Sequence, residues 1–304
     1  PERLWEAARP LLDAGGKRLR PTMMLLVAEA LVDVDPLSAD YRSFPALEGG
    51  PVDLLRGAAS VEVIHTFTLI HDDIMDEDPL RRGVAAVHEE YDDATAIIAG
   101  DTLFSSAFEL LTETGAPADR ALAAINLLAE TCTRICEGQS LDIDFEARDD
   151  VVPEEYVEMI DHKTAVLYGA SAAIPAILLG ADDDTVEELY AFGREVGQAF
   201  QIHDDVLDLT VPSETLGKQR GSDLVEGKQT IITVHARDQG VDVDGLVDAD
   251  SPEAVTEAEI EAAVEELEAA GSIAYAREMA HDLADSGKSR LAVLPDNEPR
   301  DLLA

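Results

Sequence analysis

The chain places three carboxylates directly after an apolar run in the stretch Leu69-Ile70-His71-Asp72-Asp73-Ile74-Met75-Asp76. Asp72 and Asp76 are four positions apart, so in a helix they lie on one face, one turn apart. A second stretch, Phe200-Gln201-Ile202-His203-Asp204-Asp205-Val206-Leu207-Asp208, repeats this pattern far downstream. The repeat predicts two apolar helices, each ending in an acidic cluster, that form walls of one metal-binding cavity.

The spacing of these aspartates indicates which metal they would bind. Carboxylate oxygens suit Mg²⁺, which is usually held by one or two carboxylates together with substrate phosphates. Asp72 with Asp76, and Asp204 with Asp208, therefore fit a metal-bridged diphosphate better than a closed protein cage. In a chain with 64 acidic residues, clusters also arise by chance, and residues 182–184 are interpreted only as a solvated cap. The recurrence after an apolar run favours metal binding.

The rest of the chain has the pattern of an all-α protein. Its 304 residues are 46% hydrophobic, which is enough for one large helical domain over residues 1–304. Apolar spacing predicts a bundle of ten or more helices, with no convincing strand alternation. The helices expected are 1–12, 21–34, 52–76, 92–111, 117–145, 152–179, 185–209 and 257–270, with loops at 35–51, 80–90 and 211–228.

The charge balance excludes several classes of function. Asp and Glu number 64 against 22 Lys and Arg, which gives a formal net charge of −42 and disfavours nucleic acid and anionic membranes as partners. The acids are spread along the chain and its hydrophobic content is normal, so disorder is not indicated. No apolar run reaches the ~18 residues of a spanning helix, and residues 1–5 lack the apolar core of a signal peptide. We expect a cytoplasmic protein of a high-salt cell, without stable membrane insertion.

The few basic residues are concentrated near the acidic motifs. The lysines are Lys17, Lys163, Lys218, Lys228 and Lys288. Lys17 and Arg20 follow a Gly-Gly turn, and Arg81-Arg82 lies just beyond the first acidic stretch. Lysine and arginine are the usual partners of phosphate oxygens. The alternative is surface ion pairing, but the positions favour an anion held between metals and bases.

These segments together resemble the trans-isoprenyl diphosphate synthase family, in particular its archaeal short-chain geranylgeranyl type from halophiles. The resemblance covers roughly residues 12 to 235. It is carried by Gly15-Gly16-Lys17-Arg18-Leu19-Arg20-Pro21, both acidic stretches, Arg81-Arg82-Gly83, Gly100-Asp101, Lys163-Thr164, Gly217-Lys218 and Gly227-Lys228.

The resemblance implies a helical bundle around a deep central cavity and a Mg²⁺-dependent prenyltransferase. Such an enzyme ionises an allylic diphosphate (dimethylallyl, geranyl or farnesyl) and joins it to isopentenyl diphosphate, and a proton is then lost. No Ser, Cys or His nucleophile is needed, but water must be kept from the allylic cation. The family also implies a homodimer.

The resemblance further assigns roles to individual residues. The main metal ligands would be Asp72, Asp76 and Asp204, with Asp73, Asp205 and Asp208 as ligands or as their supports. The allylic diphosphate would be held by Arg81, Lys163, Thr164, Gln201, Lys218 and Lys228. Isopentenyl diphosphate would be held by Lys17, Arg20, His65 and Arg82. We expect Asp72, Asp76, Asp204, Lys163 and Lys228 to be the catalytic set.

In this family the residues before the first acidic motif set product length. Phe67, five positions before Asp72, would be a bulky floor, and Thr68 beside it is small. This arrangement resembles enzymes that make geranylgeranyl diphosphate (C20), whereas a farnesyl or C25 product is the alternative. Ala86 stands where relatives usually carry Thr, which affects one polar contact of the 80–90 loop.

Two further readings of the sequence have to be weighed. A terpene cyclase of similar fold would need no second diphosphate site, so the basic residues around Lys17 and Arg82 speak against it. A non-catalytic subunit would be free to lose its acidic and basic motif residues, and Asp72, Lys163 and Lys228 are present.

Overall fold

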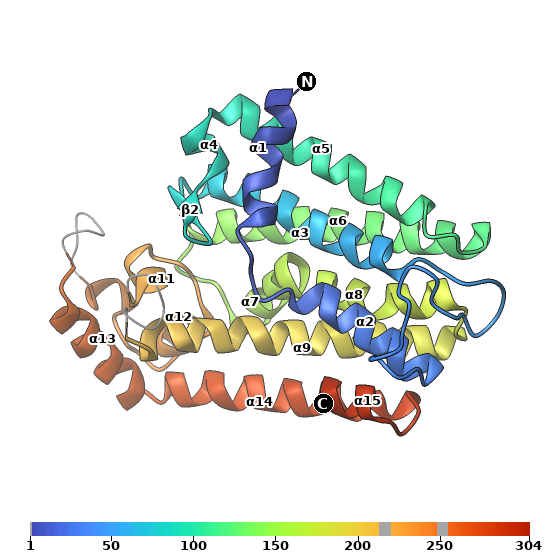
Figure 1. Cartoon of the computed structure of the whole chain (residues 1–304). Coiled ribbons are helices and arrows are strands. Elements are labelled where there is room, and N and C mark those ends of the chain that lie inside the picture. The colour runs from blue at the N-terminus through green and yellow to red at the C-terminus, as the bar shows by residue number, and fades with distance from the viewer. Residues whose placement is uncertain (1, 213–219, 248–254) are drawn as a thin grey trace. The chain divides into compact units, whose positions relative to one another are not determined.

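The computed structural model describes residues 2–212, 220–247 and 255–304. The predicted all-α class is confirmed (Figure 1). Packing divides the chain into two compact units, each described here by itself: residues 1–130, 169–190 and 291–304 in unit 1, and residues 131–168 and 191–290 in unit 2. That residues 1–304 form a single domain stays a prediction. Lys218, one of the predicted diphosphate ligands, lies outside the described residues.

Unit 1 holds the first acidic stretch. Its elements are α1 (Glu2–Asp13), α2 (Leu19–Val32), α3 (Leu54–Met75), β1 (Leu80–Arg81), β2 (Val84–Ala85), α4 (Val87–Glu90), α5 (Asp93–Thr112), η4 (Leu291–Val293) and α15 (Glu298–Leu303). Three helices contribute residues to both units: α6 (Ala118–Phe145), α8 (Val166–Leu179) and α9 (Asp183–Thr210).

Helix α3 is positioned by its N-cap and by its contact with α5. Asp53 caps the helix by accepting a hydrogen bond from the Arg56 amide at 3.2 Å. The two helices are in close contact at Gly100, where a Cβ atom would lie 2.3 Å from Nε2 of His71. The His71 ring is itself held, with Nε2 3.2 Å from the carbonyl oxygen of Ile97. Because Gly100 has no side chain, the acidic end of α3 can lie directly against α5.

The predicted loop at 80–90 contains a small hairpin. Strands β1 and β2 pair antiparallel, and Arg82 and Gly83 form the turn between them with φ of 54° and 78°. Positive φ at both turn positions is the type I′ arrangement, which usually selects Asn or Gly. Arg82 therefore adopts a strained backbone conformation. Strands of two residues are too short to show alternation, so the sequence did not reveal them.

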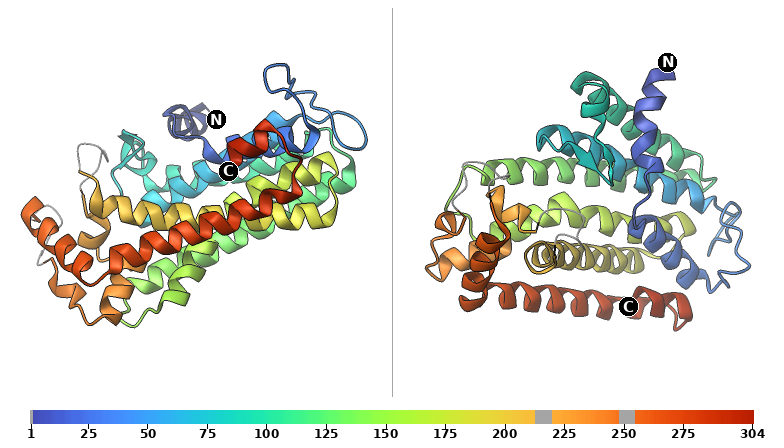
Figure 2. Two further views of the ribbon diagram at one scale, coloured as in Figure 1. Left: turned by 90° about the horizontal axis from the view of Figure 1, so that it is seen from below. Right: turned by 60° about the vertical axis from the view of Figure 1, so that its left-hand side comes forward.

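Unit 2 holds the second acidic stretch and a separate core. Its own elements are α7 (Pro153–Ile160), the π-helical η1 (Asp161–Ala165), α11 (Ser222–Val225), α12 (Ile231–Asp238), η2 (Val243–Gly245), α13 (Glu257–Ala269) and α14 (Ser272–Arg290). Helix α12 packs on α7, α13 and α14. Helix α14 also lies beside α9 (Figure 2), where Arg290 donates to Glu195 at 2.8 Å. The C-terminal acidic helices thus contribute to a packed core.

Two helical stretches are long and apolar enough to cross a membrane by length and composition, Asp93–Thr112 and Pro153–Leu179. The expectation that no apolar run reaches this length is therefore wrong. In Pro153–Leu179, 78% of the apolar window is buried inside the protein, against 33% in Asp93–Thr112. Core helices pass the same test, so two such stretches are weak evidence for a membrane span.

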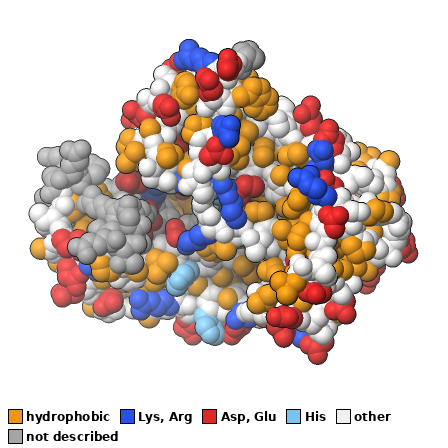
Figure 3. Space-filling view, in the orientation of Figure 1, with side chains coloured by type: hydrophobic (Ala, Val, Ile, Leu, Met, Phe, Trp, Pro, Cys, Tyr) orange, Lys and Arg blue, Asp and Glu red, His pale blue; other side chains and the backbone are white. Residues whose placement is uncertain are grey.

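Acidic side chains are distributed over the face seen in Figure 3 and are not gathered in one patch. This agrees with the charge pattern of the sequence and with a protein suited to high salt.

Replacing Gly100 by Ala should destabilise the protein by about 1–3 kcal/mol, because the new methyl group would overlap the held His71 ring. Urea unfolding in high KCl would measure the change. Ser105→Ala, at an exposed position of the same helix, is the control and should stay within about 0.5 kcal/mol of the wild type. Equal stability of Gly100→Ala and wild type would contradict the close helix contact.

Candidate active site

The first acidic cluster lies at the C-terminal end of α3, and its three aspartates differ in environment. Asp76 is exposed and Asp72 is half-buried, whereas Asp73 is only 1% exposed. Nε of Arg81 donates to Oδ1 of Asp73 at 2.5 Å, and the same guanidinium donates to Asp78 at 2.6 Å. Asp73, the inner aspartate of the motif, thus orients Arg81. Asp72 and Asp76, the outer two, are more accessible to solvent.

The electrostatics of this helix end are unfavourable for anions. Burial raises the pKa of Asp73, although the neighbouring Arg81 opposes the shift. The C-terminus of a helix also carries partial negative charge, which disfavours carboxylates in its last turn. A cation near Asp72 and Asp76 would relieve this repulsion. The donor set therefore fits a divalent metal.

The second cluster, near the end of α9, also combines accessible and buried aspartates, but here two of the three are buried. Asp204 is exposed, whereas Asp205 and Asp208 are 5% and 1% exposed. Asp205 accepts hydrogen bonds from the Tyr156 hydroxyl and, at 3.0 Å, from the Gln201 amide. Burial raises the pKa of Asp205 to about 8. The buried aspartate thus anchors its neighbours.

Asp208 fixes the segment that follows α9. Its Oδ1 accepts from Ser222 Oγ at 2.9 Å, and its Oδ2 accepts from the Asp223 amide at 3.2 Å. Both oxygens are therefore engaged by α11. Among the three aspartates of this cluster, Asp204 is the accessible one.

Thr164 and Gln201, both predicted to hold the allylic diphosphate, are hydrogen-bonded to each other. Thr164 Oγ1 donates to Oε1 of Gln201 at 3.0 Å. The Gln201 amide is thus oriented at both ends, by Thr164 on one side and by Asp205 on the other. Tyr156, seven residues before Lys163, completes this series of hydrogen bonds by donating its hydroxyl to Asp205. Sequence spacing alone did not identify it.

Lys163 and Thr164 lie in a π-helical turn between α7 and α8. A π turn inserts one extra residue and changes which side chains share a face, and such turns are frequent at functional sites. Asp161 at its start accepts from Arg194 at 2.9 and 2.5 Å and from Gln198 at 2.9 Å. Helix α9 therefore holds the turn from one side.

Two glycines let neighbouring helices approach this turn. A Cβ atom at Gly138 of α6 would lie 2.2 Å from the amide nitrogen of Lys163, and one at Gly197 of α9 would lie 2.6 Å from Cα of Ala165. Asp142, one turn after Gly138, accepts from Nζ of Lys163. The backbone contact and the ion pair together position Lys163, and neither glycine had been singled out from the sequence.

A cluster of basic residues in unit 1 contains the predicted isopentenyl diphosphate ligands. Lys17 is exposed, and Arg20, His65 and Arg82 are half-buried. Burial, and then the charges of Arg20, Arg82, Arg18 and Arg81, lower the pKa of His65 well below its ordinary value. His65 is therefore a neutral hydrogen-bonding group within a cationic cluster, which suits a diphosphate oxygen.

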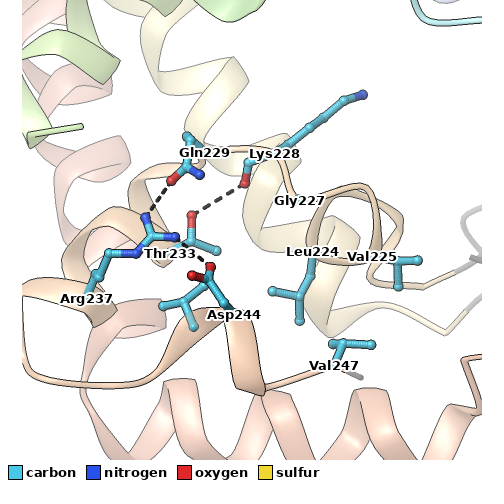
Figure 4. Close-up of a pocket in the computed structure, with 10 residues that line it drawn as sticks. Leu224, Val225, Gly227, Lys228, Gln229, Thr233, Arg237, Asp244 and Val247 are labelled. Atoms are coloured by element: carbon cyan, nitrogen blue, oxygen red, sulfur yellow. Dashed lines mark hydrogen bonds and ion pairs between the residues drawn. The ribbon is translucent and has the colours of Figure 1, made fainter. Parts of the chain in front are cut away.

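Lys228 follows Gly227, whose φ is 73°. Its Nζ lies 3.0 Å from Oε2 of Glu226. Figure 4 shows the Lys228 side chain pointing away from the pocket behind it, in which Arg237 bridges Gln229 and Asp244 at 2.6 and 3.1 Å. The lysine is thus directed outward from its own loop.

Phe67, the predicted floor residue, belongs to a row of aromatic rings. Its centroid is 4.8 Å from that of His71 and 5.2 Å from that of Phe104, and Phe108 follows at 5.0 Å from Phe104. Thr68 bonds back to the His65 carbonyl at 2.8 Å. Sequence reasoning missed Phe104 and Phe108, although their spacing of four on α5 was a usable signal.

The structure therefore brings the predicted residues together in groups within each unit. Within the described residues, no group of three or more His, Cys, Asp or Glu side chains forms a protein-only metal cage. That substrate phosphates complete the coordination stays a prediction.

Comparisons with known proteins agree with these features. The polyprenyl synthetase family model matches residues 1–267. Geranylfarnesyl diphosphate synthase of Natronomonas pharaonis is 67% identical over 303 residues, covering 100% of this chain and 88% of that protein. The solved geranylgeranyl pyrophosphate synthetase of Geoglobus acetivorans superposes with a TM-score of 0.86 at 42% identity, covering 100% and 90% of the two chains. A Caulobacter crescentus polyprenyl synthase complexed with calcium and isoprenyl diphosphate has a TM-score of 0.81 at 34% identity, with 98% and 85% covered.

The raised pKa of Asp205 gives a pH-dependent prediction. Between about pH 5 and pH 8 the folded protein keeps a proton on Asp205 that the unfolded chain has released, so this group's contribution to stability falls as the pH rises. Relative to Asp205→Asn, the wild type should therefore lose about 1–4 kcal/mol across that interval. Urea unfolding in high KCl with EDTA measures it.

Asp183→Asn, an exposed position at the start of α9, is the matched control. The free energy of unfolding of Asp183→Asn should differ from that of the wild type by the same amount at every pH. If the difference in unfolding free energy between Asp205→Asn and the wild type were also the same at every pH, Asp205 would be ionised in the folded protein.

Proposed function

We propose that this chain, which belongs to the polyprenyl synthetase family, adds isopentenyl diphosphate to dimethylallyl, geranyl and farnesyl diphosphates and makes geranylgeranyl diphosphate as its main product. The observation that carries the proposal is the pairing of two kinds of anion-binding group. Each acidic motif has an accessible outer aspartate beside buried, anchored ones, and a separate basic cluster surrounds neutral His65.

The metal would be Mg²⁺. Asp72 and Asp76, at the C-terminal end of α3, would be its ligands in unit 1, and Asp204 on α9 would be its ligand in unit 2. Asp73, Asp205 and Asp208 would act as supports, because their oxygens already accept hydrogen bonds from Arg81, from Tyr156 and Gln201, and from α11. When bound, the metal supplies stabilisation of negative charge on the leaving diphosphate.

The chain's own residues bind and orient that leaving group. Arg81, Lys163, Thr164, Gln201 and Lys228, together with Lys218, would donate to its oxygens as the allylic C–O bond breaks and the electron pair moves to diphosphate. The double bond of isopentenyl diphosphate then forms a bond to the allylic carbon, and a proton passes from the adduct to the released diphosphate. Lys17, Arg20, His65 and Arg82 would hold the second substrate for this attack.

Two diphosphate sites favour condensation over cyclisation. A terpene cyclase has one diphosphate to hold, which would leave the cationic cluster around His65 without a function. A non-catalytic subunit would not need the fixed geometry of Lys163, whose π turn is held by Asp161 and two glycines.

The proposed product length rests on the row of rings beginning at Phe67. Phe67 packs against Phe104, and Phe108 lies behind Phe104, so the rings would close the path of a growing chain. Truncating the first ring would remove a bulky floor.

A second candidate is the C25 product, geranylfarnesyl diphosphate. The relative that is 67% identical carries that name, whereas the structurally similar protein from Geoglobus acetivorans is named for the C20 product. Incubation with labelled isopentenyl diphosphate and farnesyl diphosphate, followed by sizing of the alcohols, distinguishes the two.

We further propose a cytoplasmic homodimer that works at high salt. Helix α5 supports the dimer, since Ile97 and Ile98 are 45% and 54% exposed side by side. Neighbouring large apolar side chains that are left exposed are candidates for burial in a protein contact.

Asp72→Ala should reduce kcat about a thousandfold, because one ligand of the proposed metal site is removed. Product formation from farnesyl and isopentenyl diphosphates in high KCl with Mg²⁺ measures this. Asp183→Ala, which removes one exposed acid from α9, should keep wild-type activity. Near-normal turnover by Asp72→Ala would refute the role of the first motif, and a wild type that elongates no allylic primer would refute the function.

Phe67→Ala should shift the products to longer chains by at least one isoprene unit, and Phe67→Ala with Phe104→Ala should extend them further. Loss of each ring opens space for about one more unit along the row. Phe108→Ala, which removes the ring farthest from Phe67, is the control and should change the distribution least. Unchanged product lengths in the double variant would place the floor elsewhere.

A further inference from the structure

Glu62 on α3 lies among the basic residues of unit 1 but was not among the residues identified from the sequence. Its side chain is 12% exposed. It accepts hydrogen bonds from Nη1 of Arg18 and, at 3.4 Å, from Nη2 of Arg82. A single, largely buried carboxylate therefore joins two arginines from different loops, one before α2 and one in the β1–β2 turn.

Both of these arginines have left-handed backbone conformations, with φ of 50° at Arg18 and 54° at Arg82. For a residue other than glycine such a conformation is strained and persists only where the surroundings enforce it. Of the non-glycine residues with positive φ in the described chain, these two share a contact with Glu62. The strained backbones aim both guanidinium groups at one carboxylate.

Carbonyl oxygens at the end of α1 also accept hydrogen bonds from the two guanidinium groups. Nη1 of Arg82 donates to the Leu11 carbonyl at 3.2 Å, and Nη2 of Arg18 donates to the Leu12 carbonyl. A Cβ atom at Gly16 would lie 3.1 Å from Cζ of Arg82, so glycine leaves room for this guanidinium. Arg82 is thus fixed by a carbonyl, a carboxylate and the shape of the Gly-Gly loop.

We propose that Glu62 is a positioning residue for isopentenyl diphosphate: it fixes the guanidinium of Arg82 and ties the Gly15–Leu19 loop to α3, without touching the substrate. The inference rests on the proposed function, since it assumes that Arg82 holds this diphosphate. It predicts that Glu62 affects one substrate and not the other, because its partners lie in the basic cluster of unit 1.

Two opposite effects follow from removing the carboxylate. Loss of a negative charge makes the cluster more cationic and would strengthen diphosphate binding. Loss of the anchor frees Arg82 to turn away and would weaken it. The repulsion acts across the intervening guanidinium, beyond the Debye length of about 3 Å at molar salt, and is weakened there, although burial of Glu62 limits the screening. The hydrogen bonds of Arg82 to the diphosphate act at contact distance and need its orientation, so we expect the loss of orientation to dominate and binding to become weaker.

The test uses the full chain in high KCl and compares wild type with Glu62→Gln. Calorimetry with isopentenyl diphosphate in EDTA measures binding at the basic cluster, and steady-state kinetics with Mg²⁺ gives KM for each substrate. Glu62→Gln should raise the Kd and KM for isopentenyl diphosphate about tenfold, while KM for farnesyl diphosphate stays within about twofold. Glu113→Gln, which removes an exposed carboxylate paired with Arg56, is the charge-matched control and should leave both unchanged.

Three other results would overturn the inference. Unchanged or tighter binding of isopentenyl diphosphate by Glu62→Gln would show that orientation of Arg82 does not depend on Glu62. An equal rise in KM for both substrates, with a lowered unfolding midpoint, would assign Glu62 a general structural role. A wild type that neither binds isopentenyl diphosphate nor elongates farnesyl diphosphate would refute the proposed function, and this inference with it.

Discussion

The arrangement of both acidic motifs depends on one electrostatic constraint, the placing of several carboxylates near the negative end of a helix. Such a cluster is unfavourable unless its members find donors or cations. In each motif the inner carboxylate is buried and bonded by the protein, Asp73 by Arg81 and Asp205 by Tyr156 and Gln201. Of the outer members, Asp72, Asp76 and Asp204 are accessible, whereas Asp208 is buried and bonded by α11. The combination of buried and accessible carboxylates at both helix ends is what makes these clusters suited to a metal that binds together with a diphosphate.

The remaining packing serves to place the partners of these carboxylates. Gly100 allows α5 to approach the acidic end of α3, and Gly138 and Gly197 allow α6 and α9 to approach the turn that carries Lys163. At such contacts a single added methyl group would overlap a held ring or a backbone atom. Small residues in this protein therefore determine the geometry of the charged ones.

Much of the fold was predictable because its signals are local. The expected helix 117–145 is observed as Ala118–Phe145, and the expected 52–76 as Leu54–Met75, since periodicity and caps lie within each segment. The π turn at Asp161–Ala165, the left-handed Arg82 and the carboxylate of Glu62 were not predictable. Each is enforced by residues distant in sequence, such as Arg194 for the π turn. The expectation that no apolar run reaches the length of a membrane span was wrong because core helices and spanning helices can share length and composition.

The central claim is that the accessible aspartates bind metal and the buried ones hold the protein groups around them. The most direct measurement is a crystal structure with Mn²⁺, isopentenyl diphosphate and a non-reactive thiolo analogue of farnesyl diphosphate, in which anomalous scattering locates the metal ions. The account predicts Mn²⁺ within bonding distance of Asp72, Asp76 and Asp204, with Asp73 still on Arg81 and Asp205 still on Tyr156. Mn²⁺ bonded to Asp73 or Asp205, or absent from Asp72 and Asp204, would contradict it.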